Sequence, residues 1–188
     1  MSTGLWIIFG VVVVVALAFI LIRNSIIGSR NRVDEAWSGI DVQLKRRHDL
    51  VPNLVETVKG YARHEREVLE RTTQARAEAM SALGSSPDAE SRAEAALSRA
   101  LADLRAVAEN YPDLRATENF QQLQRNLSEI EDEIQASRRI YNSNAQAYNT
   151  RIEVFPNSIV AGLGGMAPRD YFEIADPSER EPAEVSFN

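Results

Sequence analysis

Cysteine is absent from this chain of 188 residues, and histidine occurs only twice. Without cysteine the chain can form no disulfide, no thiolate zinc site, no cysteine nucleophile and no acylated lipoprotein cysteine. Basic side chains are also fewer than acidic ones, 21 against 27, so that the formal net charge is -6. Such a balance argues against binding to nucleic-acid phosphates as the main task, and we expect no nucleic-acid partner.

Motifs of common catalytic and metal sites are missing as well. His48-Asp49 resembles the paired ligands of metallophosphohydrolases, but only His64 remains as a further histidine. A di-iron bundle needs Glu-x-x-His turns, and neither histidine follows a glutamate in that way. His64 and Glu67 share a helical face, as surface pairs commonly do. We therefore predict that the protein is not an enzyme, and we assign no catalytic, cofactor-binding or metal-binding residue.

No charged residue interrupts "LWIIFGVVVVVALAFILI" at 5–22. At about 1.5 Å per residue, this run makes roughly 27 Å of helix, enough to cross a bilayer. A cleaved signal peptide is the alternative, because Ala16-Leu17-Ala18 has the small-x-small form of a cleavage site. However, no cation precedes the run, and cleavage would leave apolar residues 19–22 at the new end. We predict an uncleaved single-pass anchor over residues 5–27.

The flanks of the run predict its orientation. Residues 1–4 carry no basic side chain, whereas Arg23, Arg30 and Arg32 follow the run closely. By the positive-inside rule, residues 1–4 are extracytoplasmic and the bulk of the chain lies on the cytoplasmic side of the membrane.

Beyond the anchor, apolar residues recur at steps of three and four, as in long helices that pack along a seam. The first helical segment extends over about 33–83 and ends at the turn "GSSPD", where Ser86 is a possible N-cap and Pro87 the first helical residue. Alanine-rich residues 89–111 form a second segment, and after Pro112 a third extends over about 117–155. The predicted stripes include Val33, Trp37, Ile40, Leu44, Val51, Val55, Val58, Ala62, Leu69, Met80 and Leu83, then Ala93, Leu97, Leu101, Leu104 and Ala108, then Phe120, Leu123, Leu127, Ile130, Ile134, Tyr141, Tyr148, Ile152 and Phe155.

The predicted fold is therefore all-α: a single N-terminal transmembrane helix, then an elongated up-and-down antiparallel bundle over residues 28–158. Pro52 removes a backbone donor and crowds the carbonyl of His48, so it kinks or splits the first segment and leaves three or four helices. Glycine-containing residues 159–175 are predicted to form a loop packed on the bundle, and residues 176–188 a flexible acidic tail.

Two polar features of the predicted bundle can be explained by packing and solvation. Lys45, Arg46 and Arg47 are predicted to form a solvated face or a docking site for an acidic partner; contact with lipid would require a bend at Gly28. Tyr141 and Tyr148 stand one heptad apart, with rings in the seam and hydroxyls directed at water or a polar partner.

Four stretches of the chain together form a recognisable pattern: "RNRVDEAWSGIDVQLKRRHDLVPNLVETVKGYARHE", "ENYPDLRATENFQQLQ", "RRIYNSNAQAYNTRIEVFPNSIVAGLGG" and "PRDYFEI". They resemble the LemA family of bacterial membrane proteins. The resemblance covers nearly the whole chain and implies one amino-terminal anchor in a bacterial membrane followed by a long helical bundle. It implies no activity, because the family has no established biochemical function.

We therefore predict a membrane-anchored, non-enzymatic scaffold or adaptor that binds protein partners or further copies of itself. We expect no cofactor and no small-molecule ligand. The alternative is a membrane-bound sensor that binds a ligand through the bundle.

Overall fold

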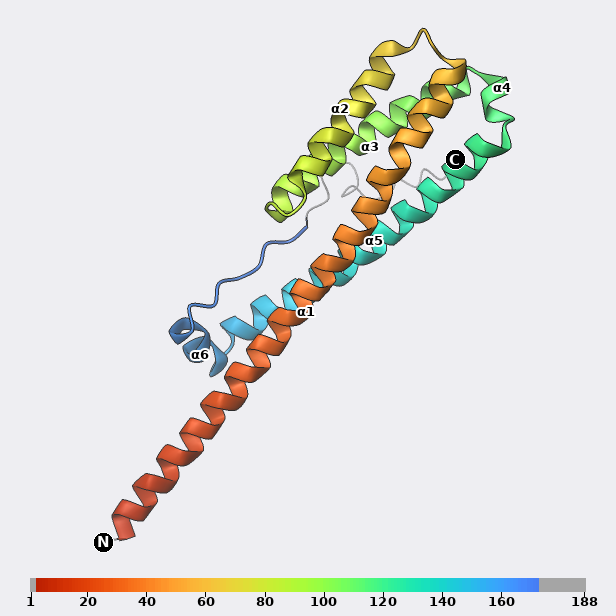
Figure 1. The fold of residues 1–188 in the computed structure, drawn as a ribbon. Coiled ribbons are helices and arrows are strands. Elements are labelled where there is room, and N and C mark those ends of the chain that lie inside the picture. The colour runs from red at the N-terminus through yellow and green to blue at the C-terminus, as the bar shows by residue number, and fades with distance from the viewer. Residues whose placement is uncertain (1–2, 173–188) are drawn as a thin grey trace, which may run out of the picture. The chain divides into compact units, whose positions relative to one another are not determined.

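The computed structural model describes residues 3–172, and every regular element in that range is a helix (Figure 1). The prediction of an all-α chain with one long apolar helix at its start is confirmed. The predicted acidic tail, the end of the predicted 159–175 loop and residues 1–2 lie outside the described residues. The helices are α1 (Thr3–Tyr61), α2 (Arg66–Ala82), α3 (Pro87–Glu109), α4 (Pro112–Arg115), α5 (Glu118–Glu153) and α6 (Asn157–Leu163).

The chain forms two compact units. Unit 1 consists of Met1–Ser38 and Arg139–Asp170, and unit 2 of Gly39–Arg138 and Tyr171–Asn188. Helices α1 and α5 each contribute residues to both units, whereas α2, α3 and α4 belong to unit 2 and α6 to unit 1.

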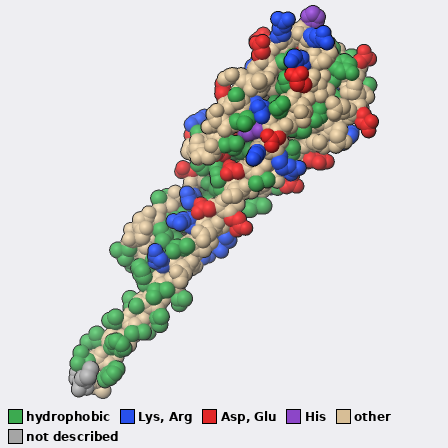
Figure 2. Space-filling model, in the orientation of Figure 1, with side chains coloured by type: hydrophobic (Ala, Val, Ile, Leu, Met, Phe, Trp, Pro, Cys, Tyr) green, Lys and Arg blue, Asp and Glu red, His purple; other side chains and the backbone are tan. Residues whose placement is uncertain are grey.

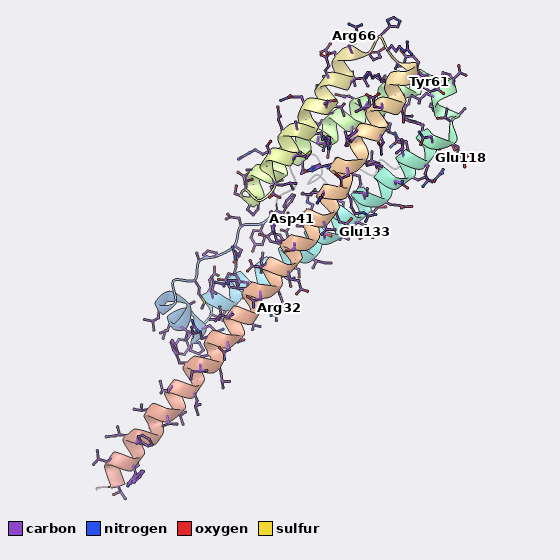
Figure 3. The ribbon with its side chains drawn as sticks, in the orientation of Figure 1. Arg32, Asp41, Tyr61, Arg66, Glu118 and Glu133 are labelled. Carbon is purple, nitrogen blue, oxygen red and sulfur yellow. The ribbon has the colours of Figure 1, made fainter. Side chains whose placement is uncertain are left out.

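Helix α1 passes through Pro52 without a break and ends at Tyr61. The first predicted segment is indeed divided, but at residues 62–65, between Tyr61 and Arg66 (Figure 3). Gly60 weakens the helix just before that point. Ala62 still donates to the carbonyl of Val58 at 2.8 Å, and Glu65 then closes a turn onto Ala62. The strongest local signal, the proline, therefore did not mark the end of the helix.

Helices α2 and α3 form an antiparallel hairpin whose turn follows the predicted chemistry (Figure 1). Gly84 adopts a φ of 77°, a backbone conformation that favours glycine. Ser86 caps α3 by accepting from the N–H of Ala89 at 3.3 Å, and Pro87 occupies the first helical position. The predicted bend at "GSSPD" is confirmed.

Pro112 opens the short helix α4, and the long helix α5 follows it. The Thr117 hydroxyl accepts from the N–H of Phe120 at 3.4 Å, which caps the start of α5. The observed helix, Glu118–Glu153, agrees with the predicted third segment within a few residues.

Most stripe residues are buried, as the periodicity predicted. Met80 and Phe155 are exceptions, with 44% and 80% of their surface exposed, so their assignment to the seam was wrong. Met80 lies two residues before the end of α2, and Phe155 lies two residues beyond the end of α5. The buried core of unit 2 includes Val51, Leu54, Val58, Ala62, Leu69, Ala79, Leu97, Leu101, Leu104, Leu114, Phe120 and Leu123.

In unit 1, α5 holds the chain that follows α6. The Tyr141 hydroxyl donates to the carbonyl of Asp170 at 2.7 Å, and the Tyr148 hydroxyl donates to the carbonyl of Ala167 at 3.2 Å. Both rings are buried, so the predicted placement of these tyrosines is confirmed. Trp37 of α1 packs edge-on against the Tyr141 ring at 5.0 Å between centroids. Within the predicted 159–175 loop, residues up to Leu163 belong to α6.

A buried ionic network as the candidate functional site

Two consecutive polar residues of α1 are buried in unit 2. Arg47 has 2% of its surface exposed and His48 1%, although Lys45 and Arg46 are exposed beside them. The prediction of a three-cation solvated face is therefore wrong for Arg47. The helical phase explains the difference, because Arg47 stands three residues after buried Leu44 and four before buried Val51.

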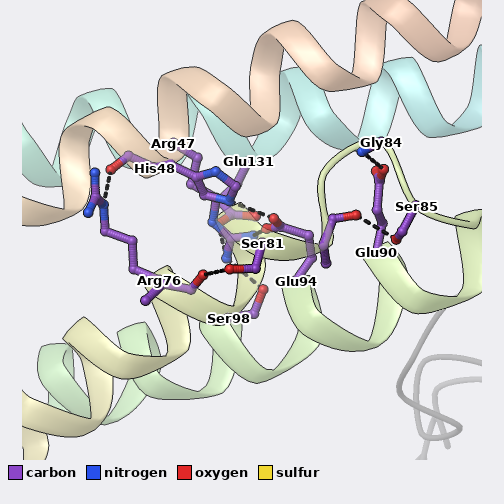
Figure 4. A network of polar contacts seen from close by, with 12 residues as sticks. Arg47, His48, Arg76, Ser81, Gly84, Ser85, Glu90, Glu94, Ser98 and Glu131 are labelled. Atoms are coloured by element: carbon purple, nitrogen blue, oxygen red, sulfur yellow. Dashed lines mark hydrogen bonds and ion pairs between the residues drawn. The ribbon is translucent and has the colours of Figure 1, made fainter.

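Glu94 of α3 links the two buried side chains (Figure 4). Its Oε2 accepts from Arg47 Nη1 at 3.0 Å, and its Oε1 lies 2.6 Å from His48 Nε2. The other guanidinium nitrogen, Arg47 Nη2, donates to Ser98 Oγ at 2.6 Å and lies 2.8 Å from Glu131 Oε1 of α5. Three helices are thus joined through one guanidinium.

The electrostatics of Glu131 fit this arrangement. Burial raises the pKa of Glu131, and the nearby Arg47 charge opposes that rise. Since removal of a charge from water is costly, each carboxylate here depends on its partner. The contacts also restrict the chemistry, because the Ser98 hydroxyl accepts from Arg47 instead of bonding to His48. These residues therefore form a buried ionic network and not a serine–histidine pair.

Arg76 of α2 completes the surroundings of His48. Its Nε donates to the backbone carbonyl of His48 at 2.7 Å. In an uninterrupted helix that carbonyl accepts from residue 52, which here is a proline without an N–H. A side chain from another helix therefore supplies the donor that Pro52 lacks.

We predict that Arg76→Met lowers the free energy of unfolding by about 1–3 kcal/mol, because it leaves a buried carbonyl without its donor. In a Pro52→Ala background the backbone N–H returns, and the same change should cost clearly less. A double-mutant cycle by urea unfolding, followed by circular dichroism, measures the difference. If Arg76→Met lowered the free energy of unfolding equally in the Pro52 and the Pro52→Ala backgrounds, Arg76 would not be replacing the N–H that Pro52 lacks.

Glu90 is a second buried carboxyl group on α3, with 1% of its surface exposed. Its Oε1 accepts from the N–H of Gly84 at 2.6 Å, which ties the hairpin turn to α3, and its Oε2 has no hydrogen-bond partner. Burial is the main cause that raises the pKa of Glu90 to about 7, and the charges of Asp41 and Glu94 contribute. Burial also raises the pKa of Asp41.

The raised pKa of Glu90 predicts a pH-dependent stability. Folded Glu90 holds its proton up to about pH 7, whereas the unfolded carboxyl loses it near the ordinary glutamate pKa of 4.5. The stabilising contribution is therefore full below pH 4.5 and is lost as pH rises to 7, by at most about 1.4 kcal/mol per pH unit. Glu90→Gln keeps an acceptor for Gly84 and should flatten this part of the profile. Urea unfolding at pH 5 and 7.5 compares the wild-type protein with the Glu90→Gln variant. An equal change in the free energy of unfolding between the two pH values in both proteins would contradict the assignment of this pH dependence to Glu90.

A groove of about 430 Å³ opens beside the network within unit 2. Arg47, Glu94 and Glu131 line it together with Arg99, Arg105 and Arg138. Phe172 also lines the groove, and its buried ring stacks under the Arg138 guanidinium, 4.8 Å from the ring centroid. With four arginines and two glutamates among its lining residues, the groove suits an anionic group better than a cationic one.

The other residues singled out from the sequence do not join this network. His64 is exposed in the turn after α1, and no group of three or more His, Asp or Glu side chains suited to a metal ion occurs within residues 3–172. Sequence reasoning missed the pairing of Arg47 with Glu94 and Glu131. One signal was available, since polar residues interrupt the apolar stripe between Leu44 and Val51.

The model of the LemA family matches residues 36–187, which include every residue of the ionic network. Protein LemA of Metamycoplasma hominis is 29% identical over 143 residues, covering 74% of this chain and 63% of that protein. Magnetosome protein MamQ 2 of Paramagnetospirillum magneticum is 26% identical over 186 residues, covering 86% and 68%. Magnetosome protein MamQ of Magnetospirillum gryphiswaldense is 24% identical over 159 residues, covering 72% and 58%. The chain thus spans about three fifths to two thirds of these relatives, and it belongs to the LemA family.

Proposed function

We propose that this protein is a non-enzymatic scaffold or adaptor, held in the bacterial inner membrane by α1, which presents its bundle to protein partners. One observation carries the proposal. The apolar window of α1 is long enough to cross a membrane, and none of it is buried within the protein (Figure 2). In water, such an exposed apolar surface is unfavourable, whereas a bilayer covers it.

The anchor is part of the helix that builds the bundle. Helix α1 continues from the apolar run to Tyr61, and its later residues supply Val51, Leu54 and Val58 to the core of unit 2. Arg23, Arg30 and Arg32 follow the run directly, which supports a cytoplasmic bundle through the positive-inside rule. Domain limits of 5–27 for the anchor and 28–158 for the bundle remain our proposal.

Membrane fractionation tests the anchor. We expect Val11→Glu combined with Val14→Glu to release the chain from carbonate-washed membranes, because charged groups are costly inside a bilayer. Val42→Glu is the matched control, since Val42 is an exposed valine of the same helix outside the apolar run. Retention of the double variant, or equal release of the control, would oppose the proposed anchor.

Cysteine labelling tests the orientation, and the absence of native cysteine makes it specific. Lys45→Cys places a single thiol at an exposed site of α1. A membrane-impermeant maleimide should leave it unmodified in intact spheroplasts and modify it after permeabilisation. Labelling of intact spheroplasts would place the bundle on the opposite side.

Crosslinking in native membranes tests the scaffold role. A photo-crosslinker at Arg99, on the groove, should recover a defined protein partner or a homo-oligomer at native expression. Crosslinker at Met80, an exposed site away from the groove lining, is the control. Recovery of only the monomeric chain from crosslinkers at both Arg99 and Met80 would count against a scaffold role.

The groove favours one alternative, a membrane-bound sensor. Its arginines and its volume of about 430 Å³ would accommodate a small anion. A reproducible thermal shift with one class of anionic metabolite, abolished by Arg105→Gln, would support that function over the scaffold.

A further inference from the structure

The chain around α6 is uncharged and unusually apolar at its surface. Between Glu153 and Arg169, no residue carries a charge. Phe155 and Leu163 have 80% and 76% of their surface exposed, and Val154 and Ile159 are exposed beside them. Scattered exposed apolar residues are common, but four within ten positions of an uncharged segment indicate a surface that is covered in the working protein.

After Asn157 and Ser158, the rest of α6, residues 159–163, has no polar side chain on either face. Val160 and Ala161 are buried within unit 1, whereas Ile159 and Leu163 of the same helix are exposed. A helix at a water-exposed surface normally carries polar residues opposite its buried side, and one that is apolar all round lies in a core or in a membrane. The outward side of α6 therefore lacks the residues that water contact favours.

Hydrogen bonds place this surface beside the end of the apolar run of α1, within unit 1. Arg151, near the end of α5, donates from Nη1 to the carbonyl of Ser25 at 3.3 Å and also to its hydroxyl. Asn157, the first residue of α6, donates from Nδ2 to the carbonyl of Arg151 at 3.0 Å. Ser25 is three residues past Ile22, where the apolar run ends. The start of α6 thus lies at the level where α1 would leave the bilayer.

The charge of unit 1 suits a headgroup layer. The whole chain has a net charge of -6, but unit 1 has six arginines against four carboxylates, a formal +2. Arg23 is exposed at the end of the apolar run. Arg151 donates a hydrogen bond to Ser25, two residues after Arg23. Cations at this level attract the anionic lipids of a bacterial membrane.

We propose that α6, together with Phe155, forms a second membrane contact: its apolar surface enters the headgroup–acyl boundary of the bilayer that α1 crosses. Val154, Phe155, Ile159 and Leu163 make up the contact, and Arg23 and Arg151 face the lipid phosphates. This inference rests on the proposed membrane span of α1. It gives unit 1 two attachments to the bilayer, one across it and one at its surface, as interfacial helices provide.

Depth-dependent fluorescence quenching tests the proposal in the full-length chain, which has no native cysteine. Leu163→Cys, Ile140→Cys and Val14→Cys variants are each labelled with a polarity-sensitive fluorophore. They are reconstituted into vesicles of phosphatidylethanolamine and phosphatidylglycerol that contain nitroxide lipids, either shallow or deep. Ile140 is the matched control, because it is an exposed apolar residue of unit 1 on α5, eleven residues before Arg151.

We expect the shallow nitroxide to quench the Leu163 label several-fold more strongly than the Ile140 label, and the deep nitroxide to quench the Val14 label. Quenching at Val14 with none at Leu163, or equal quenching at Leu163 and Ile140, would overturn the second contact and leave the anchor intact. Failure at Val14 would remove the anchor and this inference together. Protection of Leu163 from both nitroxide lipid and aqueous iodide would assign the surface to a second copy of the chain and would also overturn the proposal.

Discussion

Replacing Glu94 with leucine is expected to lower the free energy of unfolding by about 3–5 kcal/mol, the cost of leaving a buried charge without its partner. Glu94 engages both Arg47 and His48, so its loss strands two buried groups at once. Arg47 would keep only Ser98 and Glu131, and the Glu131 side chain is 38% exposed. Urea unfolding in detergent micelles, followed by helical circular dichroism, measures the change.

Two companion variants sharpen that experiment. Asp103→Leu removes a carboxylate from the same helix, but Asp103 pairs with Arg71 where both side chains are about half exposed, so we expect a cost under about 1 kcal/mol. Arg47→Met combined with Glu94→Leu removes both charges and should recover much of the stability lost by Glu94→Leu alone. Equal losses for Glu94→Leu and Asp103→Leu would show that burial does not govern this ion pair.

Leu97→Ala is expected to cost about 2–5 kcal/mol, because the side chain is fully buried in the core of unit 2 and a cavity replaces it. Met80→Ala is the matched control. Met80 was predicted to lie on the same kind of stripe, but 44% of its surface is exposed, and its truncation should cost under about 1 kcal/mol. The same unfolding measurement separates the two. A large loss at Met80 would mean that a partner or another copy covers it.

Local chemistry was sufficient to predict several elements. Ser86, Pro87 and the preceding glycine define the start of α3 through a cap, a fixed φ and a left-handed turn. Signals of this kind act within a few residues and need no knowledge of neighbouring helices, which is why they can be predicted from a single sequence.

The ionic network depends on residues far apart in the chain. Arg47 and Glu94 are 47 positions apart, and periodicity alone cannot show which buried carboxylate meets which buried cation. The phase of α1 does distinguish Arg47 from Lys45 and Arg46. Of these three residues, only Arg47 lies on the same helical face as buried Leu44 and buried Val51. Burial of the arginine could thus be predicted, but its partners could not.

Pro52 illustrates how tertiary contacts override a local rule. By its own chemistry the residue favours a kink or an end to the helix. Arg76, from α2, donates to the carbonyl that Pro52 leaves free, and α1 continues to Tyr61. The position of the helix end then depends on where the chain must turn toward α2, which weak signals such as Gly60 do not specify.

The placement of the aromatic pair Trp37–Tyr141 has a practical consequence. The chain has two tryptophans, Trp6 in the apolar run and Trp37 against Tyr141, and both belong to unit 1. Unit 2 contains none, so the intrinsic emission of tryptophan reports on unit 1 alone, whereas the far-ultraviolet signal sums over all helices. Recording both signals during one denaturant titration therefore shows whether damage to the Glu94 network melts the two units in one step or in two.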